Sequence, residues 1–182
     1  MLKAADNPPI VSPLVSRLAD LDGRWWVAHT RPRCEKAFAW DLIRRSIGYF
    51  LPLARRVRMS GGRKRRVLMP LFPSYVFFCG REEDRYAAMT TNRVCQTIEV
   101  ADQSRLAEEL TAIETALAGQ ADLDLYPFAA AGQRCRVTAG PFQGVEGVVV
   151  QRSRQARLVL QVTILGQGAC LEIDADVLEP VD

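Results

Sequence analysis

The segment from Ser74 to Cys79, SYVFFC, is apolar at consecutive positions rather than at alternate ones. In an extended strand, Tyr75 and Phe77 would point to one side of a sheet, and Val76 and Phe78 to the other. A strand with one face in water alternates between apolar and polar residues. This segment therefore predicts a strand whose second face also needs an apolar partner.

A strand followed by a helix is expected before it. Residues 24–30 are rich in aromatic and β-branched residues, which predicts the strand. Thr30 is expected to cap the helix, with Pro32 in its first turn, and the helix should end near Gly48. Its apolar positions at helical spacing are Cys34, Phe38 and Leu42.

Residues 49–69 predict a basic β-hairpin, because two extended runs flank the turn at 60–62. A short helix is expected through Met89 and a strand over 94–100. An amphipathic helix follows, with apolar positions at steps of four, three and four: Leu106, Leu110, Ile113 and Leu117. This order fits an α+β domain with an antiparallel sheet and helices on one face.

The chain is expected to have four parts. Residues 1–22 predict a poorly ordered tail, and residues 23–118 hold the α+β domain. Residues 119–131 show no regular period and predict a linker. From 132 to 182, five short β-rich runs separated by glycines predict a small barrel or sandwich.

Charge is unevenly distributed along the chain. Residues 24–100 contain 16 Lys or Arg against 6 Asp or Glu, whereas residues 132–182 contain 5 against 6. A local excess of this size suggests a polyanionic neighbour. The alternative is a solvated face that only keeps the protein soluble.

Catalytic, metal and cofactor sites are not expected. The five cysteines are widely spaced without a CxxC pair, and His29 is the only histidine, which argues against zinc. His29 and Cys34 lie on different expected elements, so they form a weak nucleophile pair. No apolar run approaches the ~20 residues of a membrane span, and no secretory signal is evident. Reduced thiols in a cytoplasm are the expectation.

Three stretches then resemble one known family. GQRCRVTAGPFQGVEGVVV, from Gly132, is similar to a KOW motif. PLFPSYVFF, from Pro70, follows an aromatic strand and a helix containing Glu35, and resembles the N-terminal (NGN) domain of the NusG family of transcription elongation factors. ILGQGACLEID resembles that family's C-terminal domain. The resemblance runs from about Arg24 to Val181, and implies an NGN-like domain followed by a five-stranded SH3-like KOW barrel.

The specialised, RfaH-like paralogues of this family are the members that this chain resembles more. The resemblance lies in the sequence PLFP, the basic hairpin and the N-terminal tail. Two features depart from that pattern. The threonine motif that contacts the polymerase gate loop would fall near residues 85–87 and is absent, and His29 stands where an aromatic residue is usual.

The resemblance implies an apolar sheet face that docks on the clamp helices of the RNA polymerase β′ subunit. On this chain the candidate residues are Phe72, Tyr75 and Phe77, with His29 from the first strand. Aromatic side chains suit docking because they bury a large area at a small entropic cost. The alternatives are that these rings belong to the core, or that the second domain masks them.

The resemblance also implies nucleic-acid contacts. Arg31 and Arg93 match positions near the exposed non-template DNA strand. The basic hairpin would lie near DNA at the upstream fork, or near the polymerase, and its cations are Arg55, Arg56, Arg58, Arg63, Lys64, Arg65 and Arg66. Arginine–phosphate contacts give affinity without sequence choice. For each cation the alternative is a solvated surface position.

In the second domain, Phe142 and the Ile164–Leu165 turn match loops that bind Rho or a small-subunit ribosomal protein in the family. The alternative for Ile164 is a core position. RfaH-like domains can refold between helices and a barrel. The many valines of residues 145–162 favour strands, and hence the barrel.

The expected function is therefore that of a monomeric elongation factor that binds RNA polymerase and suppresses pausing or termination, while its KOW domain recruits a partner. An RNA- or ribosome-binding KOW protein is the alternative, but it predicts a basic KOW domain, and residues 132–182 carry one acid more than bases. An enzyme using Cys34 or Cys95 is the third class.

Overall fold

The computed structural model describes residues 7–13, 17–128, 130–151 and 155–181. The chain divides into two compact units, Met1–Gln103 and Ser104–Asp182. Helix α3 (Gln103–Ala118), expected in the first domain, falls almost entirely within the second unit. The domain boundaries expected from the sequence stay a prediction.

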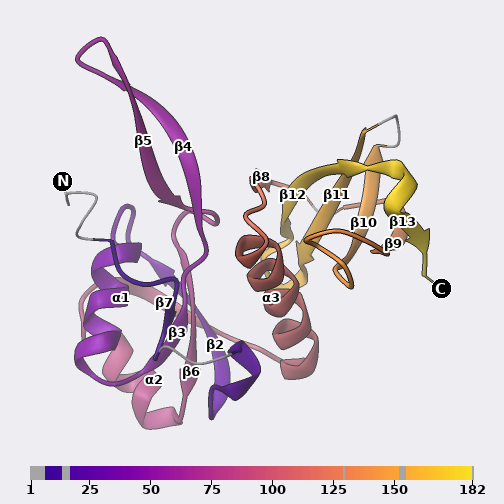
Figure 1. Ribbon diagram of the computed structural model, residues 1–182. Coiled ribbons are helices and arrows are strands. Elements are labelled where there is room, and N and C mark those ends of the chain that lie inside the picture. Colours follow the sequence, from indigo (N-terminus) through magenta and orange to yellow (C-terminus); the bar gives the residue numbers. More distant parts are fainter. Residues whose placement is uncertain (1–6, 14–16, 129, 152–154, 182) are drawn as a thin grey trace. The chain divides into compact units, whose positions relative to one another are not determined.

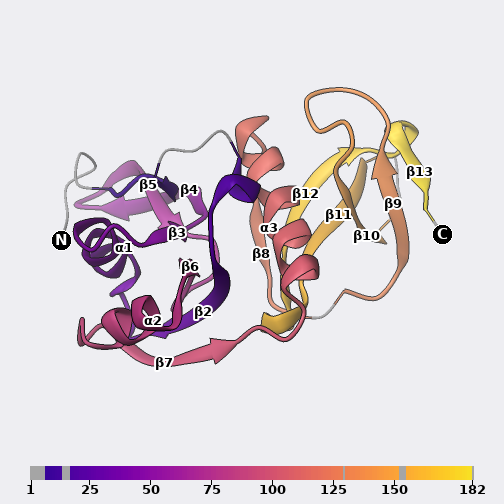
Figure 2. The same ribbon diagram turned by 90° about the horizontal axis from the view of Figure 1, so that it is seen from below.

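The first unit is built on a five-stranded antiparallel sheet with the order β1-β3-β6-β2-β7. The edge strand β7 lies beside β2 (Figure 2). Two α-helices accompany the sheet, α1 (Glu35–Arg44) and α2 (Glu82–Met89). The strands in chain order are β1 (Val11–Ser12), β2 (Arg24–Thr30), β3 (Gly48–Phe50), β6 (Tyr75–Gly80) and β7 (Val94–Glu99).

One face of this sheet packs against α1 and α2 (Figure 1). Val76 and Phe78 of β6 join the same buried cluster as Phe38 and Leu42 of α1 and Ala88 of α2. The rings of Phe38 and Phe78 meet edge to face, with their centroids 6.2 Å apart. The alternation expected for β6 is therefore present, since Val76 and Phe78 supply the face beneath the helices.

Helix α1 begins later than the sequence suggested. Thr30 was expected to cap it, but Thr30 remains in β2, where its backbone N–H donates to Ser74 O at 2.8 Å. A turn containing Arg33 at φ 63° intervenes, and Cys34 occupies the N-cap. The expected cap was wrong because pairing within the sheet extends the strand through Thr30, so that Pro32 lies in the connecting turn.

The stretch expected to be a tail contributes two short elements to the first unit. Val11 pairs with Phe50 as β1 adds to the edge of β3. The hydroxyl of Tyr49 donates to Pro9 O at 2.8 Å, and a 3₁₀ turn, η2, spans Leu18–Asp20. A two-residue strand is too short to show a period of two, so local pattern could not reveal it.

A two-stranded hairpin extends from this sheet (Figure 1). Strands β4 (Leu53–Ser60) and β5 (Arg63–Pro70) pair without a register shift, from Leu53 with Pro70 to Ser60 with Arg63. Gly61 and Gly62 form the tip at φ 58° and 74°, the left-handed values that a tight two-residue hairpin turn requires. The predicted basic hairpin is present, although β3 is a separate strand of the main sheet.

The second unit holds a six-stranded antiparallel sheet with the order β13-β9-β10-β11-β12-β8. Helix α3 lies beside β8 and β12 (Figures 1 and 2), and Glu109 of α3 accepts a hydrogen bond from Thr163 N at 3.0 Å. Short 3₁₀ turns, η3 (Thr163–Leu165) and η4 (Ala175–Val177), flank β12. The strands are β8 (Asp124–Tyr126), β9 (Gln133–Val137), β10 (Glu146–Gln151), β11 (Gln155–Val162), β12 (Gln167–Asp174) and β13 (Leu178–Pro180).

This sheet does not confirm the expected five-stranded barrel. Within the described residues, β13 and β8 are its two ends and do not pair with each other. Strand β8 comes from the segment expected to be a linker, with Tyr126 opposite Gly168. Gly147 allows a close approach, because an added Cβ would lie 2.7 Å from Val159 O.

Replacing Phe78 by Ala should lower the free energy of unfolding of the first unit by about 3–5 kcal/mol, because it removes a fully buried ring that packs on Phe38. Urea unfolding followed by circular dichroism measures the change. Val57→Ala, at a hairpin position that is 63% exposed, should change it by no more than about 0.5 kcal/mol. Equal losses in the two variants would contradict the assignment of the core.

Candidate functional site

The second face of the first sheet carries a set of aromatic rings. His29 and Tyr75 stack with centroids 5.2 Å apart, because β2 and β6 place them directly opposite each other. Phe77 contacts Phe72 edge to face at 6.0 Å and Phe50 at 6.4 Å. The structure therefore places the predicted docking residues on or beside one face and adds Phe50, which only the pairing of β3 with β6 could reveal.

Burial divides these residues into two groups. Phe72 and Phe77 are 1% and 0% exposed, whereas His29 and Tyr75 are partly exposed. In the chain as folded, the His29–Tyr75 stack is the part of the set that a partner reaches. Phe77 lies two residues along β6 from Tyr75, on the same face, and is buried against Phe50 and Phe72.

Glu35 fixes the turn that leads into β6. Its carboxylate lies in the first turn of α1, is 6% exposed, and accepts a hydrogen bond from Ser74 N at 2.7 Å. Ser74 sits at φ 67°, and Tyr75 N donates to Phe72 O at 3.2 Å. A carboxylate here is also favoured by the positive end of the helix dipole. Glu35 thus sets the turn between Phe72 and Tyr75, a role that the sequence did not reveal.

The structure brings Arg31 and Arg93 together. Arg31 N donates to Arg93 O at 2.8 Å, and the Arg31 guanidinium donates to Asn92 Oδ1 at 3.0 Å. Arg93 is held by Asp41, with Nε 3.2 Å from Oδ2, and this hydrogen bond raises the pKa of Arg93. Asp41 also pairs with Arg44. Arg31 is therefore the more available cation of the two.

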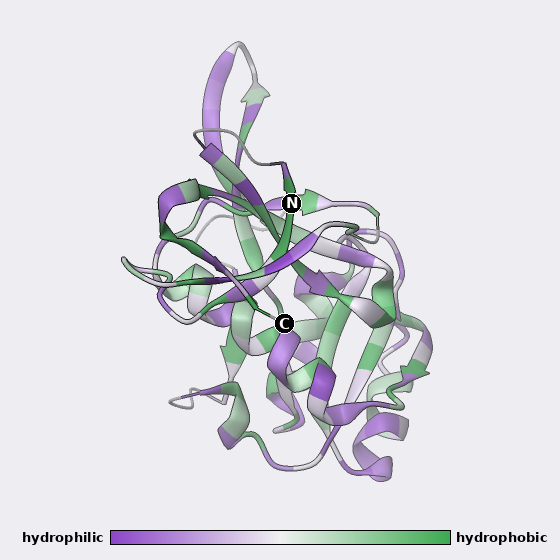
Figure 3. Cartoon of the chain, turned by 90° about the vertical axis from the view of Figure 1, so that its right-hand side faces the viewer, coloured by the Kyte–Doolittle hydropathy of each residue, from purple (hydrophilic) through white to green (hydrophobic). Residues whose placement is uncertain are grey.

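The hairpin forms a second candidate surface. It is hydrophilic over much of its length, with shorter hydrophobic parts (Figure 3). Its predicted contact residues Arg63, Lys64, Arg65 and Arg66 are all exposed. At its base, Lys36 Nζ donates to Leu68 O at 2.6 Å and to Asn7 Oδ1 at 2.5 Å, and burial lowers the pKa of Lys36. The hairpin is therefore anchored to α1 at one end and exposed at the other.

Residues 85–87, where the threonine motif that contacts the polymerase gate loop is absent, lie in helix α2. The Arg85 guanidinium lies 5.3 Å from the Trp26 ring centroid and 4.7 Å from that of Tyr86. Glu82 pairs with Arg85, and this hydrogen bond lowers the pKa of Glu82. Tyr86 itself is 61% exposed, so this surface presents an aromatic ring and a paired arginine.

The predicted partner residues of the second unit do not form one surface. Phe142 lies beside Gly119, just after the end of α3, since a Cβ added there would be 2.8 Å from its ring. Ile164 and Leu165 lie on η3, which is bonded to Glu109. At about 1.5 Å per residue along a helix, those two positions are about 15 Å apart.

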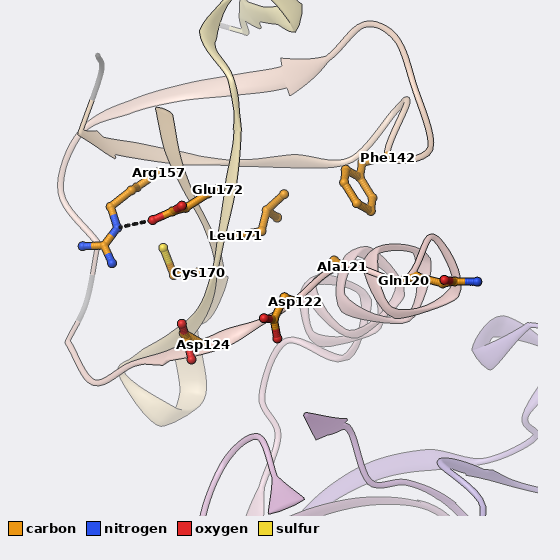
Figure 4. Close-up of a pocket in the computed structure, with 9 residues that line it drawn as sticks. All are labelled: Gln120, Ala121, Asp122, Asp124, Phe142, Arg157, Cys170, Leu171 and Glu172. Carbon is orange, nitrogen blue, oxygen red and sulfur yellow. Dashed lines mark ion pairs between the residues drawn. The ribbon is translucent and has the colours of Figure 1, made fainter. Parts of the chain in front are cut away.

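Near Phe142 the second unit also has a pocket of about 280 Å³ (Figure 4), which the sequence did not indicate. Asp122 and Asp124 line one part, and Arg157 and Glu172, 3.9 Å apart, line another. Cys170 lies among them, and burial raises the pKa of its thiol. Three of the nine lining residues are acids, one is an arginine and one is aromatic.

Neither a group of metal-ligating side chains nor a membrane-spanning helix is found among the residues that the structure describes. In the described part of the chain, no three His, Cys, Asp or Glu residues gather as metal ligands would. Among the helices that the structure describes, none is both long and apolar enough to cross a bilayer.

Comparison with known proteins gives the family. A family model described as "Transcription termination factor nusG" matches residues 23–115, which is more than half of the chain. The chain belongs to the NusG family. A search of curated proteins gave no match. The matched range includes the strands β2, β3, β6 and β7, the helices α1 and α2 and the hairpin of the first unit, and ends before the KOW-like motif.

Two solved structures are similar to this NusG-family chain. One, titled "Domain interaction in Thermotoga maritima NusG", is 18% identical with a TM-score of 0.47. The other, titled "Crystal Structure of MjSpt4:Spt5 complex conformation B", is 16% identical with a TM-score of 0.27. Each match covers 87% of this chain and 97% of the other. The RfaH-like specialisation, the KOW assignment and the roles of the individual site residues stay predictions.

Replacing Glu35 by Ala should reduce the free energy of unfolding by about 1.5–3 kcal/mol, the range for a hydrogen bond to a charged group, because Ser74 N loses its acceptor. Glu35→Gln keeps an oxygen acceptor and should lose less than half as much. Urea unfolding of both variants measures the difference. Equal losses would show that the hydrogen bond to Ser74 does not carry the effect.

Proposed function

We propose that this NusG-family protein is a transcription elongation factor that binds RNA polymerase and reduces pausing or termination. It acts as a monomer in the cytoplasm, without a cofactor and without catalysing a reaction. The specialised, RfaH-like antitermination role is part of this proposal. The family match over residues 23–115 supports a NusG-like factor. The sequence PLFP before β6 is the feature that supports the RfaH-like role.

The observation that carries the proposal is the His29–Tyr75 stack on the sheet face opposite α1 and α2. A docking site needs aromatic side chains that are rigid before binding and partly open to a partner. Packed rings on the same face support this rigidity, since Phe77, two residues along β6 from Tyr75, contacts both Phe50 and Phe72. The partner proposed for this face is the pair of clamp helices of the β′ subunit.

The effect on elongation follows from preferential binding. A factor that binds the closed, elongating state of the polymerase more tightly than the paused state shifts the population toward elongation. Arg31, at the edge of the first unit, is proposed to meet the non-template DNA strand, with Arg93 positioned beside it by their backbone hydrogen bond. Phosphate contact of this kind adds affinity without reading sequence.

The second unit is proposed to recruit a protein partner, either Rho or a small-subunit ribosomal protein. Its charges favour a protein over a nucleic acid, because Arg134 and Arg136 both pair with Glu146, at 2.9 Å and 2.5 Å. These pairs lower the pKa of Glu146 and leave one uncompensated positive charge among the three side chains. Phe142 and the Ile164–Leu165 turn then mark two separate candidate contacts rather than one.

Replacing both His29 and Tyr75 by Ala should weaken binding to core RNA polymerase about 30-fold, the effect of losing about 2 kcal/mol at a hot spot. Retention of tagged protein variants by purified bacterial core polymerase, titrated to give Kd, measures this. Phe77 is left intact, because its complete burial would mix a folding defect with a docking defect.

Phe128→Ala is the matched control, since Phe128 is an aromatic residue of the second unit that is 69% exposed. Its affinity should stay within about twofold of the parent chain. If both variants bind as tightly as the parent, the stack is not the docking site. Run-off transcription across a terminator, with and without the protein, then gives the sign of the effect, and increased termination would contradict antitermination.

A further inference from the structure

The sheet face that carries the His29–Tyr75 stack has no charged side chain on the four strands β3, β6, β2 and β7. Side chains directly opposite each other in neighbouring strands share a face, so the pairing register identifies its members. They are Gly48 and Phe50 of β3, Tyr75, Phe77 and Cys79 of β6, Trp25, Val27 and His29 of β2, and Gln96 and Ile98 of β7.

A partner can reach one end of this face. Val27 and Phe77 are completely buried, whereas His29 and Tyr75 are partly exposed and Gln96 is exposed. These last three residues form one row across β6, β2 and β7, since His29 lies opposite Tyr75 on one side and opposite Gln96 on the other. In the part of the chain that the structure describes, their side-chain polar groups have no hydrogen-bond partner.

His29 is the member of this face that can gain a charge near neutral pH. Histidine is the residue type that ordinarily changes its charge between pH 5 and 8, whereas tyrosine ordinarily ionises above this range. Burial raises the pKa of the Cys79 thiol to about 11. Protonation of His29 therefore places a positive charge on a face that is otherwise neutral.

The segments around His29 supply no free counter-charge for this proton. The carboxylate of Glu35 is bonded to Ser74 N, and Glu99 of β7 pairs with Arg24 at 2.6 Å. Arg31, two residues after His29, is itself a cation. The other ionisable side chains of β6 and β7 are the hydroxyl of Tyr75 and the thiols of Cys79 and Cys95.

The free and docked states treat a protonated His29 differently. In the free chain the imidazolium is partly hydrated, and it stacks on the Tyr75 ring with centroids 5.2 Å apart, an arrangement that favours a cation. Docking removes the water, and burial of a charge without a partner is costly. Desolvation lowers the proton affinity of a buried histidine. The neutral imidazole is therefore the form that suits the docked state.

We propose that the docking face binds its partner with His29 neutral, so that a proton and RNA polymerase compete for this face. Docking then releases a proton from chains that carry one. The affinity is fully present above the range in which histidine gains its proton, and it is lost as the pH falls through that range. The inference rests on the proposed function, because it concerns the same docking face.

Two variants of His29 separate the charge from the ring. His29→Phe keeps an aromatic ring on Tyr75 and cannot be protonated. His29→Arg carries a planar cation that stacks on aromatic rings and stays charged at every pH used. The Kd of each chain for purified bacterial core polymerase is measured at pH 8 and at pH 5.5. Groups of the polymerase that titrate cancel in the ratio of two Kd values taken at the same pH.

The ratio of the parent Kd to the His29→Phe Kd should rise about tenfold from pH 8 to pH 5.5. One proton that must leave before docking changes the affinity by at most tenfold for each unit of pH. The ratio of the His29→Arg Kd to the His29→Phe Kd should be at least about tenfold and equal at the two pH values. A parent ratio that stays constant would overturn the proposal. A ratio that falls at pH 5.5 would overturn it as well, because the partner would then supply an acid to the proton.

Calorimetry gives a second readout of the same competition. Binding heats measured at pH 6 in two buffers of different ionisation enthalpy count the protons that docking releases. The parent should release up to one proton more per complex than His29→Phe, and equal release would contradict the proposal. Circular dichroism at each pH confirms that the chains being compared are folded.

Binding at pH 8 separates this inference from the function on which it rests. If the parent chain binds no polymerase at pH 8, the proposed function fails. If the parent binds polymerase at pH 8 and its ratio to His29→Phe does not change with pH, the docking function stands and only the competition with a proton fails.

Discussion

Strand β6 is hydrogen-bonded to β2 on one side and to β3 on the other, and the structure of the first unit depends on this central position. One face of β6 must pack beneath α1, which Val76 and Phe78 do. Its other face must also be apolar, and there Phe77 contacts rings from β3 and from the turn before β6. A one-residue slip would exchange the two faces, so the register that builds the core also presents Tyr75 to His29.

The two candidate surfaces of the first unit are anchored to the same part of this sheet. Glu35 links the first turn of α1 to the turn at Ser74, just before Tyr75. The next residue of α1, Lys36, donates a hydrogen bond to Leu68 O at the base of the hairpin. Neighbouring residues of one helix thus hold the docking face and the basic hairpin. A fixed geometry of this kind favours binding, because flexible surfaces lose affinity to the entropy of ordering.

The second unit differs from the first in its electrostatics. Glu146 pairs with Arg134 and Arg136, and its single negative charge offsets one of their two positive charges on strands β9 and β10. Phe142 and η3 lie at separate positions along α3, and the pocket beside Phe142 has three acids and one arginine in its lining. These features suit contacts with proteins, whereas the positive charge of the chain is concentrated in residues 24–100, including the hairpin.

The local sequence pattern determined those elements whose conformation can be read from a single segment. Three elements could be predicted from a few neighbouring residues each. These are β6 from its consecutive apolar residues, α1 from the helical spacing of Phe38 and Leu42, and the hairpin from the two glycines between its basic runs. Tertiary structure decided what depends on distant partners: the strand β1, the start of α1 after Cys34, the pairing of β8 with β12, and the open sheet in place of a barrel. It also decided which rings stay accessible, since the burial of Phe77 comes from residues far away in the chain. Periodicity reports the faces of one element, but pairing and burial are properties of two elements at once, so no single segment contains them.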